Sequence, residues 1–537
     1  MRNSIIDSKG SLLRTRFGEL TFGNCLTFTV DGEETFKLIY DELIKAKGCI
    51  YIANYDLDPR LRFVRDSSPS LRPNSSPNYL IRSPCTFGEA SDNKDNNNDS
   101  GNNSNRKLAE ETYSLQDLLI EKAKQGVEVK IIIWQPRLEL RIIPGADERG
   151  LGGRTKEVEM MNEHAKSNGI EQNLMVRIDN TAPTITSGHH DKIIVIDNQV
   201  GFCGGLDLSR GKWDTSDHDF DNSLRDANSH PWHDVHAMVR GPVVWDLIYH
   251  FHQRWVYSQT KDVRQVRDME IKSPFSNHGG DGNTSIIALR TWHKFNRNGG
   301  ILAWYAGMFR KAKESIYIEN QFPFENKFIT QLLVKRLKQV KNLKVITVSP
   351  VDPNLPGFIG SIIAKASVND IDENLKLLRK TGEDRVKTYC LISQHDSIKE
   401  KRKQIYVHSK VMIIDDKWIT IGSANMDRDG FRDSSELDLG ILAPTSARQL
   451  RVKLWREHLG GHKNKNTGND IGNTIKDVNL DSFDDGFRAW EKLADDNGKR
   501  ALKNEAISGH VYYHNFEEMN LPPPYIGAKD DTKFKWI

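Results

Sequence analysis

The sequence predicts an α/β protein made of two related halves, each with a mostly parallel sheet that helices cover on both faces. Two observations lead to this fold. Residues 190–197 read HDKIIVID and residues 408–415 read HSKVMIID, so the pattern His-x-Lys-x-x-x-x-Asp occurs twice, each time followed by Gly-[Gly/Ser]-x-[Asp/Asn]. Helix-like and strand-like segments also alternate along both halves, which is typical of parallel sheets covered by helices.

The first half opens with a helix and a buried strand that return later in the chain. Apolar residues recur at helical spacing in residues 33–47, and AKGCIYIAN at 46–54 contains the buried strand. AKESIYIEN at 312–320 matches this segment, and the helix–strand pair at 118–132 corresponds to the pair at 332–346. The same elements therefore follow one another in the same order in both halves.

These correspondences predict the domain boundaries. We expect a lead at 1–19, a first half at 20–258, a linker at 259–285, a second half at 286–460 and a tail at 461–537. The first half is longer because it contains a Ser-, Pro- and Asn-rich tract at 66–111. Such a polar tract cannot bury a core, so we expect a disordered surface insertion.

Size and composition describe an ordinary globular protein. The chain has 537 residues, of which 37% are hydrophobic and 28% charged, and its net charge of +3 does not indicate a nucleic-acid binder. Its five cysteines are odd in number and scattered, which indicates neither a disulfide framework nor a zinc site and favours a reducing compartment. We see no secretory signal and no apolar run long enough for a membrane span.

The repeated motif places an imidazole and an ammonium on one face of each strand. Residues two apart in a strand point the same way, so His190 lies beside Lys192, and His408 lies beside Lys410. If the halves pack about a pseudo-two-fold axis, all four side chains converge on one cleft. This set suits a phosphodiester: the lysines neutralise the phosphate oxygens, one neutral histidine attacks phosphorus, and the other protonates the leaving alcohol. No metal or other cofactor is required, and a bell-shaped pH profile is expected.

Each imidazole also needs a group that fixes its tautomer, usually a carboxylate on the second nitrogen. An acidic residue opens a short strand downstream of each motif: Asp234 in the first half and Glu436 in the second. The simplest assignment stays within each half. It pairs Asp234 with His190 and Glu436 with His408.

The segments that follow the motifs supply candidates for phosphate binding: Gly205, Asp207, Ser423 and Asn425. Asp207 stands where the second copy has Asn425, which puts a carboxylate beside the phosphate site. We expect this carboxylate to point away or to be compensated by Lys192. The motif aspartates, Asp197 and Asp415, lie on the opposite face from the lysines, and we expect them to tie down the loops after their strands.

With these residues in hand, the chain resembles the phospholipase D superfamily, and specifically its eukaryotic-type branch. Besides the two motifs, the similar segments include IANYDLDP at 52–59, PWHDVH at 231–236, IENQF at 318–322 and LWREHLG at 454–460. They occur in family order across residues 20–460. The resemblance implies two pseudo-two-fold-related α-β-α sandwich domains with the active site at their interface. It also implies metal-independent hydrolysis of phosphatidylcholine-like lipids to phosphatidic acid, and phosphatidyl transfer to primary alcohols.

The resemblance also implies roles and partners. His190 is the nucleophile that forms a covalent phosphohistidine, and His408 is the acid. The partner is a phospholipid membrane surface, which a monomer reaches as a peripheral protein without a transmembrane segment; no nucleic acid is expected. We expect a cytoplasmic protein, with export as an effector without a Sec signal as the alternative.

Other functions fit the sequence less well. A phosphodiesterase of the same superfamily acting on nucleic acid is disfavoured by the near-neutral charge, since tracking a phosphate backbone needs a basic groove. A cardiolipin-type phosphatidyltransferase usually carries N-terminal membrane segments. An inactive interaction protein would not need both motifs intact. The His-rich stretches at 189–191 and 233–236 could bind a metal, but no third cluster has ligand spacing.

Overall fold

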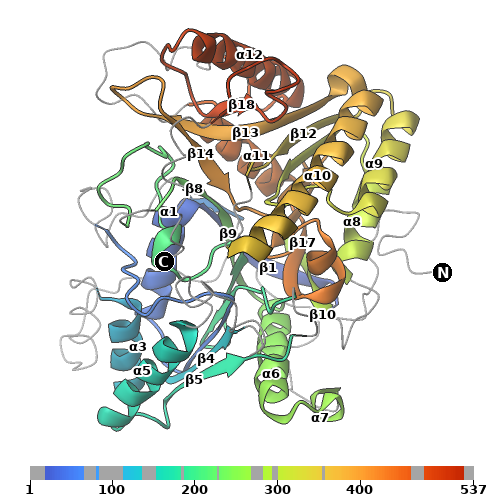
Figure 1. Ribbon diagram of the computed structural model, residues 1–537. Helices are drawn as coiled ribbons and strands as arrows, with labels where there is room; N and C mark the ends of the chain where they lie inside the picture. The colour runs from blue at the N-terminus through green and yellow to red at the C-terminus, as the bar shows by residue number, and fades with distance from the viewer. Residues whose placement is uncertain are drawn as a thin grey trace, which may run out of the picture.

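Two sheets, joined along one strand, form the frame of the protein (Figure 1). The protein was studied as a computed structural model, which describes residues 19–65, 80–83, 113–135, 153–182, 187–226, 229–267, 282–292, 300–352, 357–460 and 477–524. Most of the predicted insertion, the middle of the linker and parts of both ends lie outside these residues.

The first sheet has the strand order β3-β1-β9-β7-β6-β2-β4-β5. Its strands are β1 (Thr21–Val30), β2 (Cys49–Asn54), β3 (Ile81–Arg82), β4 (Glu128–Trp134), β5 (Leu174–Asp179), β6 (Ile193–Ile196), β7 (Val200–Gly204) and β9 (Val235–Arg240). The motif strand β6 lies in the middle of this sheet. His190 therefore sits just before a strand that is fully buried.

The second sheet repeats this order as β10-β17-β16-β15-β11-β12-β13, and both β14 and β18 pair with β13. Its strands are β10 (Thr284–Trp292), β11 (Ser315–Glu319), β12 (Lys344–Val348), β13 (Val386–Gln394), β14 (Arg402–Val407), β15 (Val411–Ile414), β16 (Trp418–Gly422), β17 (Ser435–Leu442) and β18 (Val511–Tyr513). The matching orders confirm the α/β fold with two related halves.

Both sheets are mixed. The predicted parallel pairing holds for β2-β4-β5 and for β11-β12-β13. Each motif strand instead turns back at once in a hairpin, so β6–β7 and β15–β16 are antiparallel. The turns lie at Asp197-Asn198 and Asp415-Asp416, where all four residues have positive φ between 49° and 57°. Two consecutive residues of this kind are typical of the tight hairpin turns that match the twist of the strands.

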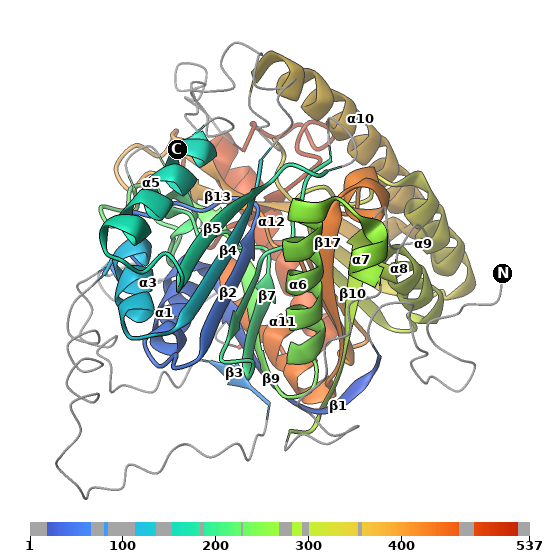
Figure 2. The same cartoon turned by 90° about the horizontal axis from the view of Figure 1, so that it is seen from below.

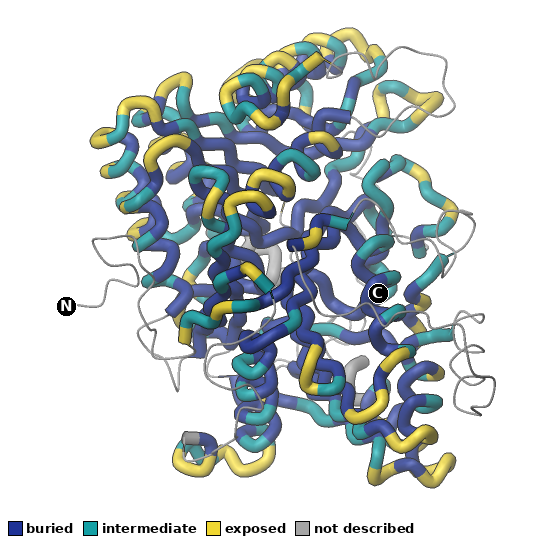
Figure 3. Tube along the Cα trace, turned by 180° about the vertical axis from the view of Figure 1, so that it is seen from behind, coloured by how far each residue is buried: buried dark blue, intermediate teal, exposed yellow. Residues whose placement is uncertain are grey.

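Helices cover both faces of each sheet, as Figure 2 shows. They are α1 (Asp31–Leu43), α3 (Leu115–Lys124), α5 (Gly153–Ser167), α6 (Val244–Thr260), α7 (Val263–Arg267), α8 (Gly300–Lys311), α9 (Lys327–Gln339), α10 (Gly357–Gly382), α11 (Pro444–His458) and α12 (Phe483–Leu502). Apolar side chains of α1, α3 and α5 pack on one face of the first sheet, and those of α8, α9 and α10 pack on the second. The remaining faces share a core with α6, α11 and α12. In Figure 3 buried chain fills the centre and exposed chain lies on the outer helices.

Two strand pairings join the halves, and the tail packs on the second half. β1 pairs with β9 and also reaches β10 of the second sheet, where Thr21 lies opposite Ile286. β8 (Trp232–His233), from the first half, pairs in parallel with β14 of the second. The tail contributes β18 and α12 to the second half. The active-site segments of one half are thus anchored in the other.

Two smaller findings concern covalent and membrane features. Cys25 is disulfide-bonded, whereas Cys49, Cys203 and Cys390 are free and buried. The odd number and scattered spacing of the cysteines did not indicate this bond. Among the described helices, none combines the length and the apolar character needed to cross a membrane.

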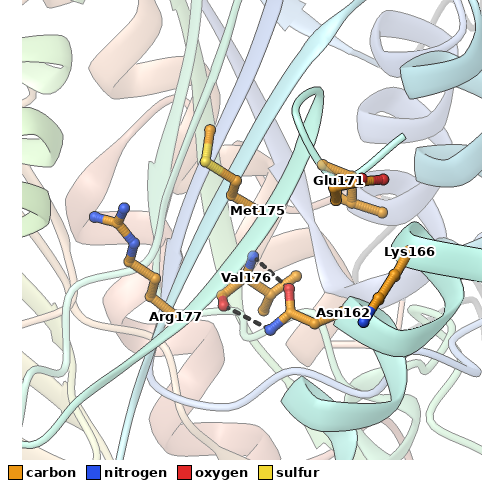
Figure 4. A pocket seen from close by; sticks show the side chains of 7 residues that line it. Asn162, Lys166, Glu171, Met175, Val176 and Arg177 are labelled. Atoms are coloured by element: carbon orange, nitrogen blue, oxygen red, sulfur yellow. Dashed lines mark hydrogen bonds between the residues drawn. The ribbon is translucent and has the colours of Figure 1, made fainter. Parts of the chain in front are cut away.

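The outer strand of the first sheet carries an unusual partner. β5 pairs with β4 on one side, and on its other side Asn162 of α5 takes the place of a strand. The Asn162 amide donates to the Val176 carbonyl at 3.0 Å, and its oxygen accepts from the Val176 N–H at 3.1 Å (Figure 4). A pocket of about 310 Å³ lies beside this contact, between Lys166 and Arg177.

Candidate active site

The two motifs meet at the interface of the halves. The rings of His190 and His408 lie with their centroids 6.3 Å apart, and the histidines precede β6 and β15, the equivalent strands of the two sheets. The side chain of Lys192 is fully buried, and Lys410 is buried as well. The structure thus brings together the two imidazoles and two ammonium groups that the repeated motif singles out.

Each lysine folds back onto its own motif. The Nζ of Lys192 donates to the carbonyl of His190 at 2.8 Å and lies 3.4 Å from the carboxylate of Asp207. The Nζ of Lys410 donates to the carbonyl of His408 and to the side-chain oxygen of Gln321 at 3.1 Å. Of the two alternatives for the Asp207 carboxylate, compensation by the first motif lysine is the one observed.

Each motif imidazole contacts the carboxylate from the other half, so the predicted pairing within each half is wrong. The Nδ1 of His190 lies 3.1 Å from the Oε2 of Glu436, and the Nδ1 of His408 lies 2.8 Å from the Oδ2 of Asp234. The reason is the packing of the halves: β17 runs beside the first motif, and β8 runs beside β14 just before the second. Each imidazole is therefore oriented by the partner half.

Burial and the lysines decide the charges of the imidazoles. Burial lowers the pKa of His190 well below its usual value, and the ammonium groups of Lys192 and Lys410 lower it further. The same three causes hold the pKa of His408 well below its usual value. Both rings are therefore neutral when no phosphate is bound, and either could offer its Nε2 lone pair.

The carboxylates behind the imidazoles differ. Burial raises the pKa of Asp234 to about 6, so this group is ionised at neutral pH. Burial raises the pKa of Glu436 well above its usual value, although the Ser423 hydroxyl donates to it at 2.6 Å. The Nδ1 of His190 is also 3.0 Å from the carbonyl oxygen of Ser423, which can only accept a hydrogen bond. This places the proton of His190 on Nδ1 and leaves Nε2 free.

The motif aspartates act at the other end of the motif strands. Asp197 accepts from the backbone N–H groups of Lys47, Gly48 and Cys49, and Asp415 accepts from those of Lys313, Glu314 and Ser315. They tie down the turns that lead into β2 and β11, not the loops after their own strands, which corrects that expectation. A carboxylate with three such bonds fixes the backbone and makes no contact with either imidazole.

The remaining predicted residues have separate roles. Ser423 donates to the carboxylate of Glu436, so it supports that group instead of facing a phosphate. At Gly205 a Cβ would lie 2.1 Å from the carboxylate of Asp234, so only glycine allows this close approach. The side-chain oxygen of Asn425 is buried and makes no hydrogen bond within the described residues. Its amide remains a candidate phosphate donor.

Aromatic rings and a third lysine complete the site, and motif spacing did not reveal them. Tyr55 stacks on Trp134 at 4.7 Å and meets His190 edge to face. On the other side, Trp232 stacks on Tyr406 at 4.7 Å, with its centroid 4.9 Å from that of His408. Lys212 and Gln321 also belong to this region, and Gln321 accepts from the Nζ of Lys410. The Nζ of Lys212 lies 3.6 Å from the centroid of the Trp232 ring.

A second polar cluster lies behind the His408 side. It comprises Asp31, His218, His233 and Glu457, all buried, whose ligand atoms lie within 4.8 Å of one another. The Nδ1 of His233 is 2.9 Å from Asp31 and 3.0 Å from Glu457, and the Nε2 of His218 is 3.3 Å from Glu457. Imidazole nitrogens and carboxylate oxygens at these separations could hold a metal ion.

Protonated imidazoles also balance the carboxylate charges of this cluster. Burial opposes a charged imidazole, but Asp31 and Asp214 raise the pKa of His218 to about 10. Glu319 and His458 extend the network, since Glu319 lies 3.0 Å from both His233 and His458. The sequence could not show this cluster, because its members come from four distant segments of the chain.

Loss of one carboxylate from this cluster should destabilise the fold. We expect Glu457→Gln to lower the free energy of unfolding by about 3–5 kcal/mol, because it leaves buried charges without their partner. Calorimetric melting with and without a chelator measures this change. An unaltered melting temperature in the variant would contradict the prediction. A chelator that lowers the melting temperature of the wild type alone would show that an ion contributes.

Comparison with known proteins agrees with this geometry. Residues 104–287 match the family model described as "Phospholipase D", and residues 305–457 match that described as "Cardiolipin synthase, PLD-like domain". Together the two matches cover more than half of the chain. Phospholipase D alpha 2 of Arabidopsis thaliana is 25% identical over 79% of this chain and 63% of its own length. Phospholipase D alpha 1 of Cynara cardunculus is 26% identical over 64% of this chain and 58% of its own length.

The chain thus spans less than two thirds of the length of these relatives. Among solved structures, phosphatidylserine synthase of Haemophilus influenzae Rd KW20 superposes with a TM-score of 0.52 over 82% of this chain and 87% of that protein. At 12% identity this likeness supports the fold alone. The paired His-x-Lys motifs at the interface of the halves, together with both family matches, show that the chain belongs to the phospholipase D superfamily.

Proposed function

We propose that the chain is a phospholipase D of the eukaryotic type, which hydrolyses glycerophospholipids such as phosphatidylcholine to phosphatidic acid and the free head group. One observation carries this proposal. His190 and His408 face each other across the interface of the halves, each with a carboxylate on Nδ1 and a buried lysine beside it. A phosphodiester between them would meet a nucleophile on one side and a proton donor on the other.

The first step forms a phosphohistidine. The Nε2 of neutral His190 attacks phosphorus, and the bond from phosphorus to the head-group oxygen breaks. That oxygen takes the proton of His408, so the head group leaves as an alcohol and not as an alkoxide. Lys192, Lys410 and the Asn425 amide stabilise the negative charge that grows on the phosphate oxygens.

The two carboxylates favour these different roles of His190 and His408. Asp234 is ionised at neutral pH, so it stabilises the imidazolium that His408 needs as an acid. The His190 Nδ1 proton faces a carbonyl oxygen and Glu436, whose raised pKa means that it ionises less readily than an ordinary carboxyl. This environment favours a neutral nucleophile.

The second step returns the enzyme to its starting state. Neutral His408 removes a proton from water, and the resulting oxygen nucleophile displaces His190 from phosphorus. Phosphatidic acid leaves, and His408 holds the proton for the next cycle. A primary alcohol in place of water gives the phosphatidyl alcohol by the same step. We place this reaction at a membrane surface, because the substrate is a bilayer lipid.

The proposal is tested by choline release from phosphatidylcholine vesicles, with a chelator present and ethanol added. We expect phosphatidylethanol from the wild type, and none from His190→Ala or His408→Ala. His164→Ala, at an exposed position on α5, is the matched control and should behave as the wild type. A folded wild type that releases no choline would refute phosphatidylcholine as the substrate, and other phospholipids and then nucleic acids would be assayed.

The depressed pKa values of both imidazoles predict an acidic optimum for kcat/KM. His190 and His408 both have pKa values well below 6.5, and the reaction needs the first imidazole neutral and the second protonated. We therefore expect kcat/KM to be highest below pH 6.5 and to fall above it. The negative charge of a bound phosphate raises the pKa of His408, so kcat should persist to higher pH.

Steady-state kinetics from pH 4 to pH 9, with the fold checked at each pH, measures both profiles. Lys192→Met should lower the rate and move the optimum toward neutral pH, because it removes a cation that depresses both imidazoles. An optimum of kcat/KM at alkaline pH would contradict the prediction.

A further inference from the structure

A buried arginine lies directly behind the nucleophile. Arg254 of α6 is fully buried, and its guanidinium bridges two carboxylates. Its Nη1 donates to both oxygens of Asp191 at 2.7 and 2.8 Å, and its Nη2 donates to Asp179 at 3.0 Å. His250, one helical turn earlier, lies 2.9 Å from Asp191. Asp191 is the residue between His190 and Lys192 in the first motif.

This carboxylate is held firmly as an anion. Burial opposes its ionisation, but Arg254 and His250 keep the pKa of Asp191 well below its usual range. At Asp179, His189 and then Arg254 outweigh burial, so the pKa of this carboxyl is also lowered. A planar guanidinium can satisfy two carboxylates at fixed angles, which an ammonium group cannot do.

Ser435 connects this arginine to the catalytic pair. The carbonyl of Ser435 accepts from the backbone N–H of His190 at 2.8 Å and of Asp191 at 3.1 Å. Its hydroxyl lies 3.5 Å from the carboxylate of Asp191. The next residue along β17 is Glu436, which meets the Nδ1 of His190. One dipeptide of the second half thus contacts both the motif of the first half and its imidazole.

We propose that Arg254 is a positioning residue that sets the register between His190 and Glu436 across the two halves. By holding Asp191, Arg254 holds the main chain of residues 190 and 191 against the carbonyl of Ser435. It thereby sets the distance between the His190 imidazole and the Glu436 carboxylate. Arg254 contacts neither histidine and takes no part in proton transfer. The inference rests on the proposed function for the role of His190 as the nucleophile. It does not rest on that function for the geometry of the contacts.

The second motif shows that this arrangement is specific to the nucleophile. At the position of Asp191 it has Ser409, whose hydroxyl donates to Glu319 at 2.7 Å. Glu319 is balanced by histidines, not by an arginine. The chain therefore tolerates serine between histidine and lysine, but supports that motif differently. His190, which forms and breaks a covalent bond to phosphorus, is the histidine with the rigid support.

Two substitutions test the inference without leaving an uncompensated buried charge. Arg254→Lys keeps the positive charge but cannot bridge both carboxylates. Asp191→Ser copies the sequence of the second motif. Rapid-quench measurement of phosphohistidine, with kcat and KM from vesicle assays, separates formation of the intermediate from its breakdown.

We expect both variants to form phosphohistidine roughly 100-fold more slowly, since a displacement of about 1 Å at a reacting group has an effect of this size. KM and the rate at which the phosphohistidine is hydrolysed should stay within about two-fold of the wild type, because His408 and the lipid contacts are unchanged. A merely structural role would lower the melting temperature without slowing one step selectively.

Arg451→Lys is the matched control. Arg451 of α11 is equally buried and donates to both oxygens of Asp416 at 2.7 Å. Asp416 belongs to the hairpin turn after β15, at the opposite end of that strand from His408. It should lose stability and keep the wild-type rate of phosphohistidine formation. Wild-type formation rates in Arg254→Lys and Asp191→Ser, or equal losses in Arg451→Lys, would overturn the inference.

A wild type that forms no phosphohistidine would refute the proposed function but leave the geometry open to test. Crystal structures of Arg254→Lys and Asp191→Ser then decide it. The distance from the His190 Nδ1 to the Glu436 Oε2, 3.1 Å in the wild type, should lengthen beyond hydrogen-bonding range. An unchanged distance in both variants would overturn the inference independently of any activity.

Discussion

Replacing His190 by alanine should remove the covalent intermediate and lower kcat by roughly 10⁴-fold or more, since the proposed nucleophile is lost. His408→Ala should behave differently with a phosphatidyl ester of p-nitrophenol. This leaving group needs no protonation, so the variant should release about one equivalent of nitrophenol and then stall as phosphohistidine. Stopped-flow absorbance measures the burst, and acid-quenched protein carries the trapped phosphoryl group.

The two variants thus distinguish the nucleophile from the acid, which the symmetric motifs do not. A burst in His190→Ala and none in His408→Ala would reverse the roles proposed here. A steady nitrophenol release by both variants would exclude a phosphohistidine altogether. His164→Ala again serves as the control, because it removes an exposed imidazole and should leave the burst and the turnover intact.

The crossed carboxylates predict a second large effect. Asp234→Asn should lower kcat for phosphatidylcholine by roughly 10³–10⁴-fold, because it removes the anion that supports the imidazolium of His408. Glu436→Gln should lower it as well, by slowing the attack of His190. With the p-nitrophenyl ester the variants separate: the burst should stay fast in Asp234→Asn and become slow in Glu436→Gln.

Pairing within each half would give the opposite result, with a slow burst in Asp234→Asn and a fast one in Glu436→Gln. Asp438→Asn is a suitable control, since Asp438 lies two residues beyond Glu436 on the same strand. Burial raises the pKa of Asp438 to about 8, so it is protonated at neutral pH and asparagine closely replaces it. This variant should retain both the burst and the turnover.

The fold and the histidines could be predicted from the sequence because they depend on local patterns. The apolar runs inside residues 190–197 and 408–415 specify buried strands, and the repeated spacing specifies the residues that point with the imidazoles. The hairpins were within reach too, since Asp197-Asn198 has the chemistry of a two-residue turn. The family matches and the strand order confirm the fold.

The crossing of Asp234 and Glu436 could not be predicted, because it depends on how one half docks on the other. Of the two motif histidines, the one nearer in sequence to each carboxylate is not the one that it contacts. The cluster around His233 could not be predicted for the same reason, since Asp31 and Glu457 come from opposite ends of the chain. Sequence patterns report what one strand or helix does, whereas these contacts arise only when distant elements meet.

Asn162 has a consequence for how copies of the protein avoid one another. The outer strand of a sheet offers unpaired N–H and C=O groups to any extended chain, and this is a common route to aggregation. In β5 both groups of Val176 are already bonded to the Asn162 amide. An incoming strand would have to displace this side chain before it could add to the sheet. A single asparagine on a neighbouring helix thus protects the sheet edge, as a charged residue, a proline or a bulge does in other proteins.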